Sequence, residues 1–593
     1  RFCLRSGHAC MLQYALLHLT GYPLALEEIL NFRQWGSLTP GHPEVHHTPG
    51  VETTTGPLGQ GLATAVGLAL AERHLAARCN TANWKPVDHF TYVLASDGDM
   101  LEGVQAEAAS LAGHLGLGKL IVLYDDNRIT IDGSTDLAFS EDVSARYAAY
   151  GWHVQKIDGH DRAAIEAAIA AARAESARPS LITARTHIAA GAPSKQDTSE
   201  SHGSPLGVEE IAGAKQAMGW PSLEPFHVPE DVRRHFLELG ARSRPVRTAW
   251  ETAFSAGRSA HPEKAALWDA LHEPRVPDAG RPVYKAGDAV PTRKASGKAL
   301  AWLLKELPGL IGGSADLTPS NNTQAGEDAP YAANNRAGRY LHYGIREHAM
   351  AAAMNGMALH GGLIPYGGTF LVFSDYLRPS LRLAAIMGAR VIYVFTHDSV
   401  LLGEDGPTHQ PIASLPALRA LPGVTVIRPS DANETVAAWE VAVGLNGPVA
   451  LALTRQDVPV LDLDAAEAVD RVRRGAYVLL EPEGDPELIL FATGSEVAPA
   501  LEAATRRNAD GARVRMVAVP SWELFFKQDE TYRRQILAPG VTNRVSVEAA
   551  STFGWERFVG LDGTTIGLDR YGASAPWKVL RARFSLDADG IES

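Results

Sequence analysis

Short apolar runs alternate with longer alanine-rich stretches along most of this chain. Six runs rich in Val, Ile and Leu predict β-strands, at 91–95, 120–124, 391–396, 424–428, 488–493 and 514–519. Between such runs, stretches such as 62–77 and 102–115 have the composition and spacing of helices. This alternation is typical of βαβ units. We therefore expect an α/β fold with mostly parallel sheets wrapped by helices.

Two interruptions divide this pattern. Nine prolines fall within residues 221–291, and an acidic, proline-containing break lies at 457–470. A chain of 593 residues is also too long for a single core. We predict three α/β domains, at 1–220, 292–460 and 470–593, with 221–291 as an extended connection between the first two.

The composition narrows the classes of partner. The net charge is −13 and no run of five basic residues occurs, so binding to nucleic acid is not expected. No uncharged apolar stretch reaches about 18 residues, so no membrane association is expected. Three cysteines without a CxxC pair predict a reducing compartment, and hence a cytoplasmic protein. Because the chain begins without Met, we expect that an N-terminal piece is missing.

Polar residues follow two of the predicted strands. Asp97 comes just after the strand at 91–95, and Asn127 follows the strand at 120–124. A right-handed crossover brings both strand ends to one edge of a sheet, so these side chains can converge. Their oxygens suit Mg²⁺ or Ca²⁺. Loop and helix-capping residues have the same composition, so the spacing alone leaves both interpretations open.

Two further patterns have both a functional and a structural interpretation. The glycine-rich segment 56–61 opens a helix and could bind a diphosphate, or could be a tight turn. Phe370, Phe373 and Tyr376 recur every three positions, as in a cofactor platform or a helix core. Histidines 42, 46 and 47 have zinc-like spacing but lack cysteine partners and a helical face, which disfavours zinc. Four histidines beside small or polar residues suggest cleft positions: His8, His202, His397 and His409.

Taken together, these motifs resemble the transketolase family of thiamine diphosphate enzymes, from the first residue to the C-terminal domain. The segments that carry the resemblance are 39–44 (TPGHPE), 56–61 (GPLGQG), Asp97-Gly98 to Asn127, 201–203 (SHG), 312–317 (GGSADL), Arg346-Glu347 and 403–409 (GEDGPTH). The resemblance implies a diphosphate-binding domain (1–220), a pyrimidine-binding domain (292–460) and a C-terminal transketolase domain (470–593). It also favours the functional interpretation of the metal pair, the glycine-rich loop and the aromatic residues.

The cofactor residues follow from this resemblance. Asp97, Asn127 and the carbonyl of Ile129 are implied as ligands of a divalent ion, Mg²⁺ or Ca²⁺, that holds the diphosphate. Glu347 is implied to protonate the aminopyrimidine, which a buried, protonated carboxyl can do. The remaining implied contacts with thiamine diphosphate are Gly56, Pro57, Leu58, Gly98, His202, Phe370, Phe373 and Tyr376.

The substrate residues are implied in the same way. Sugar phosphates are the expected substrates, and two arginines with a histidine would oppose the net negative charge locally. The residues implied to transfer protons are His8, His42, His202 and His409. Asp405 is implied to bind the C2 hydroxyl. The residues implied to bind the phosphate are Arg293, Ser320, His397 and Arg455. The family's active sites lie between subunits, which implies a homodimer with Glu102 and Glu107 at the interface.

The expected activity is the reversible transfer of a two-carbon ketol unit from xylulose 5-phosphate to ribose 5-phosphate or erythrose 4-phosphate, in the pentose phosphate pathway. Related enzymes such as dihydroxyacetone synthase or deoxyxylulose phosphate synthase share the cofactor residues, and a non-catalytic scaffold is a further alternative. A nicotinamide dehydrogenase is disfavoured because no GxGxxG follows a strand. The chain departs from the family at Gly7-His8-Ala9-Cys10, where Gly-His-Gly-Ser is usual, and lacks the N-terminal helix.

Overall fold

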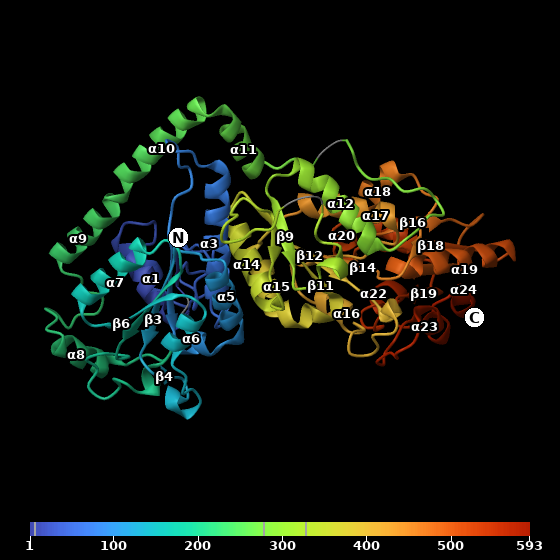
Figure 1. Cartoon of the computed structure of the whole chain (residues 1–593). Helices are drawn as coiled ribbons and strands as arrows, with labels where there is room; N and C mark the ends of the chain where they lie inside the picture. The colour runs from blue at the N-terminus through green and yellow to red at the C-terminus, as the bar shows by residue number, and fades with distance from the viewer. Residues whose placement is uncertain (5–6, 277–278, 326–328, 593) are drawn as a thin grey trace. The chain divides into compact units, whose positions relative to one another are not determined.

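The computed structural model describes residues 1–4, 7–276, 279–325 and 329–592. Two compact units contain these residues, and the elements are labelled in Figure 1. Unit 1 consists of residues 1–269, 332–337 and 352–362. Unit 2 consists of residues 270–331, 338–351 and 363–593.

Unit 1 is built on a five-stranded sheet in which every neighbouring pair is parallel, in the order β1-β2-β3-β7-β6. Its strands are β1 (Phe2–Leu4), β2 (Thr91–Ser96), β3 (Leu120–Asp126), β6 (His153–Asp158) and β7 (Ser180–Arg185). A separate antiparallel pair consists of β4 (Ile129–Thr130) and β5 (Gly133–Ser134). The non-consecutive order shows that crossover connections join the strands, as the βα pattern predicts.

Helices pack on this sheet through small and apolar residues. The longest, α3 (Gln60–Cys79), is almost wholly buried against β1, β2, β3 and α5. Its alanine and glycine content explains this, because small side chains allow close helix packing on a sheet. The other helices of unit 1 are α1 (Cys10–Leu19), α2 (Leu26–Leu30), α4 (Asp97–Leu101), α5 (Gly103–His114), α6 (Val143–Ala149), α7 (Arg162–Ala174), α8 (Val208–Ala217), α9 (Glu230–Ala241) and α10 (Ser243–Ala260).

The proline-rich stretch 221–291 contains three helices: α9, α10 and α11 (Pro262–His272). Pro229 is the N-cap of α9, Pro245 lies in the first turn of α10, and Pro262 is the first residue of α11. Proline is tolerated at these positions because the first N–H groups of a helix have no partner within it. The prolines therefore begin helices here. The domain boundaries drawn from them stay a prediction.

Unit 2 holds a six-stranded, fully parallel sheet in the order β10-β9-β11-β12-β14-β13. Its strands are β9 (Leu310–Ser314), β10 (Tyr340–His342), β11 (Ile364–Phe370), β12 (Ile392–Thr396), β13 (Thr425–Ile427) and β14 (Val449–Leu453). The neighbouring helices are α12 (Thr292–Glu306), α13 (Thr318–Asn321), α14 (Glu347–His360), α15 (Ser374–Met387), α16 (Ser414–Arg419) and α17 (Ala432–Gly444). A short antiparallel pair joins β8 (Ala289–Val290) to β15 (Val458–Pro459).

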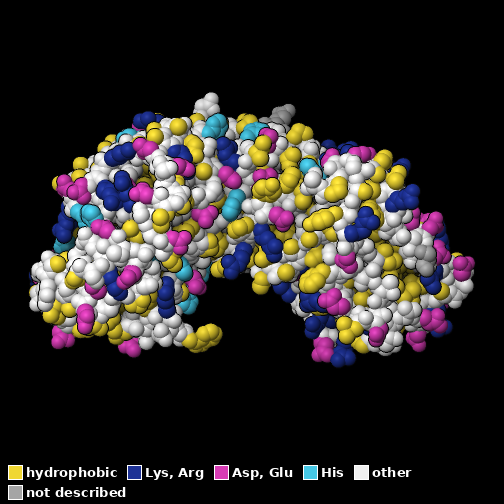
Figure 2. Space-filling view, turned by 90° about the horizontal axis from the view of Figure 1, so that it is seen from below, with side chains coloured by type: hydrophobic (Ala, Val, Ile, Leu, Met, Phe, Trp, Pro, Cys, Tyr) yellow, Lys and Arg dark blue, Asp and Glu magenta, His cyan; other side chains and the backbone are white. Residues whose placement is uncertain are grey.

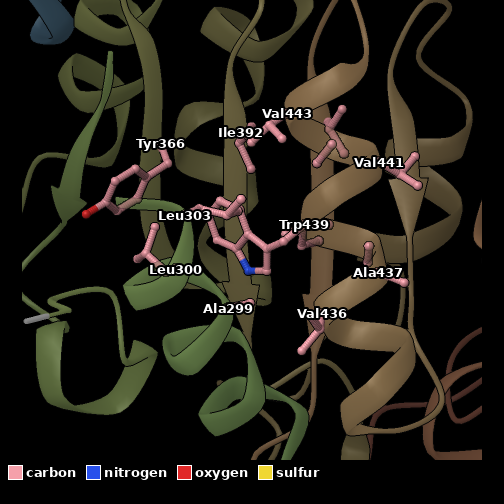
Figure 3. Packing of buried hydrophobic residues seen from close by; sticks show 14 of the residues in the cluster. Ala299, Leu300, Leu303, Tyr366, Ile392, Val436, Ala437, Trp439, Val441 and Val443 are labelled. Atoms are coloured by element: carbon pink, nitrogen blue, oxygen red, sulfur yellow. The ribbon is translucent and has the colours of Figure 1, made fainter. Parts of the chain in front are cut away.

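The core of this sheet centres on Trp439 of α17, which is fully buried. Its ring lies among the apolar side chains of α12 and the strands, including Leu303 and Tyr366 (Figure 3). Its indole N–H donates a 2.7 Å hydrogen bond to the hydroxyl of Ser296. This bond satisfies the one polar atom of the ring, so burial of Trp439 does not leave a donor without a hydrogen bond.

The C-terminal part of unit 2 forms a mixed five-stranded sheet in the order β16-β18-β17-β19-β20. Only the edge strand β16 pairs antiparallel. The strands are β16 (Tyr477–Leu480), β17 (Leu488–Ala492), β18 (Val514–Ala518), β19 (Arg544–Val547) and β20 (Thr564–Ile566). The helices are α18 (Ala468–Arg474), α19 (Val497–Ala509), α20 (Trp522–Phe526), α21 (Glu530–Leu537), α22 (Glu556–Val559), α23 (Trp577–Arg583) and α24 (Ala588–Glu592).

The predicted fold class is confirmed. Each of the six apolar runs forms a strand within two residues of its predicted ends, and each belongs to one of the three large sheets. On the face seen in Figure 2, basic and acidic side chains intermingle, so the net negative charge is not gathered into a single patch there. Among the described residues, none of the helices is long and apolar enough to cross a membrane.

Candidate active site

The first candidate cluster of unit 1 lies where β2 and β3 end. Ser96, the last residue of β2, is paired with Asp125 of β3, so the residues that follow each strand are neighbours. Asp97 begins α4 and is only 2% exposed. The N-cap of this helix is Ser96, which forms a capping box with Asp99, whose carboxylate accepts a 3.0 Å hydrogen bond from the backbone N–H of Ser96. Asp97 is therefore not needed as the capping residue.

The carboxylate of Asp97 is held by two donors. Tyr124 donates its hydroxyl to Oδ1 at 2.6 Å, and the backbone N–H of Arg128 donates to Oδ2 at 3.0 Å. Burial, with the nearby negative charges of Asp126 and Asp125, raises the pKa of Asp97 to about 6. Among the residues that the structure describes, no cation forms an ion pair with Asp97. Burial of the charged carboxylate costs free energy, and a bound cation would offset that cost.

Asn127 completes the cluster. Its Nδ2 donates to Asp125 at 3.1 Å, and its Oδ1 accepts the backbone N–H of Ile129 at 2.9 Å. The bond from Arg128 to Asp97 brings this loop against the start of α4. One carboxylate, one amide oxygen and one backbone carbonyl form an all-oxygen donor set, which fits a hard divalent ion. The structure thus brings together Asp97 and the 127–129 loop, as the strand topology predicts.

The glycine-rich loop packs against this cluster. The backbone N–H of Gly59 donates to Asp99 at 3.2 Å, just before α3 begins. A Cβ added to Gly98 would approach the Leu58 side chain to 2.9 Å, so the two segments touch. Gly56 has φ +136° and lies against the ring of His42. Glycine is required at position 56 by its backbone angle, and His42 is fixed beside the loop.

An open cavity of about 530 Å³ adjoins the metal-type cluster. Asp97 and Tyr124 form part of its wall, and Arg128, Lys156 and Arg185 add positive charge. Acidic side chains such as Asp126 also line it. The lining holds five carboxylates and three basic side chains, and Arg128 and Lys156 form ion pairs with Asp126 and Asp142, so the charge of the cavity alone does not select an anion.

The second candidate cluster lies in unit 2 around Glu347, the first residue of α14. This side chain is buried, and its Oε1 accepts a 3.2 Å hydrogen bond from the hydroxyl of Thr369. Thr369 belongs to β11 and directly precedes Phe370. The contact therefore fixes the carboxyl beside the first residue of the aromatic series. Nothing in the local sequence of Thr369 predicts this role.

The three aromatic residues extend from the interior to the surface. The rings of Phe370 and Phe373 are stacked, with centroids 5.8 Å apart and planes inclined by 11°. Tyr376 packs edge-on against Phe373 and is 65% exposed. A core stripe would be buried throughout, so an exposed end favours a platform for a flat ligand.

Two histidines adjoin this platform. The ring of His397 lies 3.8 Å from that of Phe370, and the ring of His409 lies 5.6 Å from that of Phe373, centroid to centroid. His397 has φ +58°, a left-handed conformation that costs free energy outside glycine. The hydroxyl of Thr396 lies 2.9 Å from its Nδ1.

Two arginines approach the same histidine. Burial, followed by the positive charges of Arg293, Arg455 and His409, lowers the pKa of His397 to about 3. Arg293 donates a 2.8 Å hydrogen bond to the carbonyl of Ser320, which places both residues at this point. Arg455 lies 3.8 Å from Glu404. Glu404 and Asp457 offset part of the positive charge of Arg455 and Arg293, and the remaining charge can attract an anion.

The lowered pKa of His397 predicts acid sensitivity. In the unfolded state the pKa of His397 is near its usual value, so between about pH 6.5 and pH 3 the unfolded state binds a proton that the folded state does not. The free energy of unfolding is therefore fully retained above about pH 6.5 and falls as the pH is lowered toward 3. We expect up to about 1.4 kcal/mol of lost unfolding free energy for each pH unit in this window. His397→Asn should remove this part of the slope. Denaturant unfolding at several pH values measures it, with the exposed His342→Asn as control. An equal slope in His397→Asn and wild type would contradict the assignment.

Three other predicted residues lie in turns or loops. His202 follows a short 3₁₀ turn, Ser199–Ser201, and is partly exposed. Asp405 is exposed in the loop before His409. The backbone of His8 lies in a 3₁₀ turn, but its side chain is outside the described residues. Sequence reasoning missed Tyr124 and Thr369, because their roles depend on contacts with residues 27 and 22 positions away.

Comparison with known proteins decides the family. The description "Transketolase, thiamine diphosphate binding domain" matches residues 1–277, "Transketolase, pyrimidine binding domain" matches 288–460, and "Transketolase-like TK C-terminal domain" matches 475–587. The chain belongs to the transketolase family. Membership brings transketolase function, so the chain is a transferase, with a domain that binds thiamine diphosphate.

Individual relatives agree with this family. Transketolase of Geobacillus stearothermophilus is 50% identical over 601 residues, covering 100% of this chain and 90% of the relative. Among solved structures, transketolase of Leishmania mexicana superposes with a TM-score of 0.95 at 45% identity, covering 100% of this chain and 88% of that one. A Pichia stipitis transketolase in complex with sedoheptulose 7-phosphate also gives 0.95, at 42% identity and the same coverage.

Proposed function

We propose that this chain transfers a two-carbon ketol unit from xylulose 5-phosphate to ribose 5-phosphate or erythrose 4-phosphate, in the cytoplasm and within the pentose phosphate pathway. The observation that carries the choice of phosphorylated substrates is the convergence of Arg293 and Arg455 on His397 beside the aromatic platform. The test is a coupled assay with xylulose 5-phosphate and ribose 5-phosphate, with and without thiamine diphosphate. Turnover that does not depend on the cofactor would contradict the proposal.

The diphosphate end of the cofactor is assigned to unit 1. Asp97, Asn127 and the carbonyl of Ile129 would hold Mg²⁺ or Ca²⁺. The all-oxygen donor set supports this, as does the buried Asp97 carboxylate, which forms no ion pair with a cation among the described residues. Gly56, Pro57, Leu58, Gly98 and His202 would contact the cofactor beside the ion. When bound, thiamine diphosphate supplies a nucleophilic carbon and an electron sink.

The pyrimidine end is assigned to unit 2. Phe370, Phe373 and Tyr376 would stack on or surround the ring, and Glu347 would hold a proton at a ring nitrogen. Thr369 supports this role because its hydroxyl binds one carboxyl oxygen of Glu347 and leaves the other available. A positioned carboxyl that exchanges a proton in the reaction is a general acid–base group.

The substrate end is assigned to residues of both units. His8, His42, His202 and His409 would move protons at the first two carbons of the donor. Asp405 would accept a hydrogen bond from the C2 hydroxyl of the acceptor. Arg293, Ser320, His397 and Arg455 would bind the phosphate. We also propose a homodimer in which each active site takes the two cofactor ends from different subunits, with the exposed Glu102 and the partly buried Glu107 at the interface.

The phosphate assignment predicts a split between acceptors. Arg455→Ala or Arg293→Ala removes charge-assisted hydrogen bonds of about 1.5–3 kcal/mol, so KM for erythrose 4-phosphate should rise by about one to two orders of magnitude. The kcat/KM for unphosphorylated erythrose should change little. Steady-state kinetics with both acceptors measure the split, and the exposed Arg382→Ala is the matched control. Equal losses for both acceptors would mean that the arginines are structural.

A further inference from the structure

Each of the two converging arginines directly follows a buried threonine. Thr292 precedes Arg293 and is the first residue of α12, whereas Thr454 precedes Arg455 and follows the last residue of β14. Both threonine side chains are 0% exposed, although they are 162 positions apart in the chain. Neither belongs to the metal cluster, the aromatic platform or the group of phosphate-binding residues assigned above.

The two threonines exchange hydrogen bonds. The backbone N–H of Thr292 donates to the hydroxyl oxygen of Thr454 at 2.9 Å, and the backbone N–H of Thr454 donates to the hydroxyl oxygen of Thr292 at 2.7 Å. The Thr454 hydroxyl donates its own proton to the carbonyl of Gln456 at 3.0 Å. The two hydroxyl oxygens are 3.2 Å apart, and because the Thr454 proton is already used, the Thr292 hydroxyl is the donor in this contact. Every hydroxyl proton in the pair has one acceptor.

This pairing ties together two segments that carry mutually repelling charges. The pKa of Arg293 is lowered by burial and by the positive charge of Arg455. The Nε atom of Arg293 is buried and has no hydrogen-bond partner in the described structure. Without an anion, the repulsion tends to separate the two guanidinium groups. The threonine pair opposes this at the backbone, one residue away from each arginine.

We infer that Thr292 and Thr454 are positioning residues that set the spacing of Arg293 and Arg455, and thereby the preference for phosphorylated over plain acceptors. This inference rests on the proposed phosphate site. A pair of arginines at fixed spacing binds a phosphate with little loss of conformational entropy, whereas unconstrained arginines must first be ordered. Loss of the pair should therefore weaken phosphate binding and leave the chemistry at the cofactor unchanged.

The alternative is that the threonines only stabilise the fold. The N–H of Thr292 is one of the donors that a helix leaves without a partner, and the Thr454 hydroxyl serves as its cap. A cap alone predicts lower stability with no difference between acceptors. Thr435 of α17 provides a matched control, because its fully buried hydroxyl donates a 2.6 Å hydrogen bond to the carbonyl of Asp431, the N-cap residue of that helix.

The experiment compares Thr454→Val and Thr292→Val with Thr435→Val and wild type, as full-length holoenzymes. KM for erythrose 4-phosphate and the inhibition constant of inorganic phosphate should both rise about tenfold in the first two variants, because a misplaced binding group loses its alignment. The kcat, and the kcat/KM for erythrose, should stay within about twofold. Thr454→Ser, which keeps the hydroxyl, should restore phosphate affinity.

Three results would overturn the inference: equal losses for both acceptors, the same split in Thr435→Val, or no rescue by serine. If Thr454→Val does not fold, Thr454→Ala is measured instead, and absence of the split there is equally contradictory. Arg455→Ala is assayed in parallel. If Arg455→Ala affects erythrose 4-phosphate and erythrose equally, the proposed phosphate site itself is wrong. If Arg455→Ala weakens only the use of erythrose 4-phosphate and the threonine variants show no such difference, only the positioning role is wrong.

Discussion

Replacing Glu347 by Gln should slow turnover by about 10²–10⁴-fold, the range that a positioned acid–base group contributes. The amide keeps the size of the side chain and can still accept the hydrogen bond from Thr369, so the fold should be retained. It cannot exchange a proton with the cofactor ring. Deuterium exchange at the C2 carbon of added thiamine diphosphate, measured in the presence of the protein, reports this step without any sugar substrate.

The control for this variant is Glu440→Gln. Glu440 is also a largely buried carboxylate of unit 2, but it forms an ion pair with Arg281. It should lose some stability and keep the wild-type exchange rate. If Glu347→Gln exchanged deuterium within a few-fold of wild type, a different carboxyl would have to carry the proton. Thermal unfolding of both variants distinguishes a lost proton donor from a lost fold.

Replacing Asp97 or Asn127 by Ala should abolish cofactor-dependent activity at ordinary metal concentrations. Each change would remove one of the three proposed ligands of the ion that would hold the diphosphate. Isothermal titration of thiamine diphosphate with Mg²⁺ should show an affinity at least about tenfold weaker, the lower end of what loss of metal-site contacts costs. Excess divalent ion should restore part of the affinity of either variant.

The control for the metal site is Asp132→Ala, which removes an exposed carboxylate from the turn between β4 and β5. It should bind the cofactor as the wild type does. Chelation of divalent ions should reduce wild-type affinity to the level of the two site variants. Wild-type affinity in Asp97→Ala would rule out the metal assignment and would leave the buried carboxylate with a structural role.

The local sequence contains enough information to predict the strands and the proximity of Asp97 and Asn127, whereas the metal assignment rests on the family resemblance. Strands buried on both faces, such as β3 and β12, are continuous apolar runs, because helices cover a parallel sheet on each side. The positions of Asp97 and Asn127 after two such runs follow from the same pattern, since parallel strands end at one edge. Family motifs then extended the prediction to Glu347 and the phosphate-binding residues.

Prolines mark the stretch 221–291 without giving the ends of its helices. The cluster at 221–291 predicts an extended connection in which prolines interrupt helical pieces such as 231–241, and the structure has α9, α10 and α11 in this stretch. The same residue that interrupts a helix in its interior is favoured in its first turn. Composition alone does not distinguish these positions, because the distinction depends on where the neighbouring helix starts.

The sequence by itself thus determined the α/β architecture and the family, and it named the residues that are proposed to carry the chemistry. Only the tertiary structure decided how polar groups are paired. Arg428 is fully buried and binds Asp398 and Glu496, which lie 30 and 68 positions away. The contacts of Thr369 with Glu347 and of Thr292 with Thr454 are of the same kind. Burial of a polar group is tolerated only when a partner is present, and that partner is chosen by the packing of distant segments rather than by any local pattern.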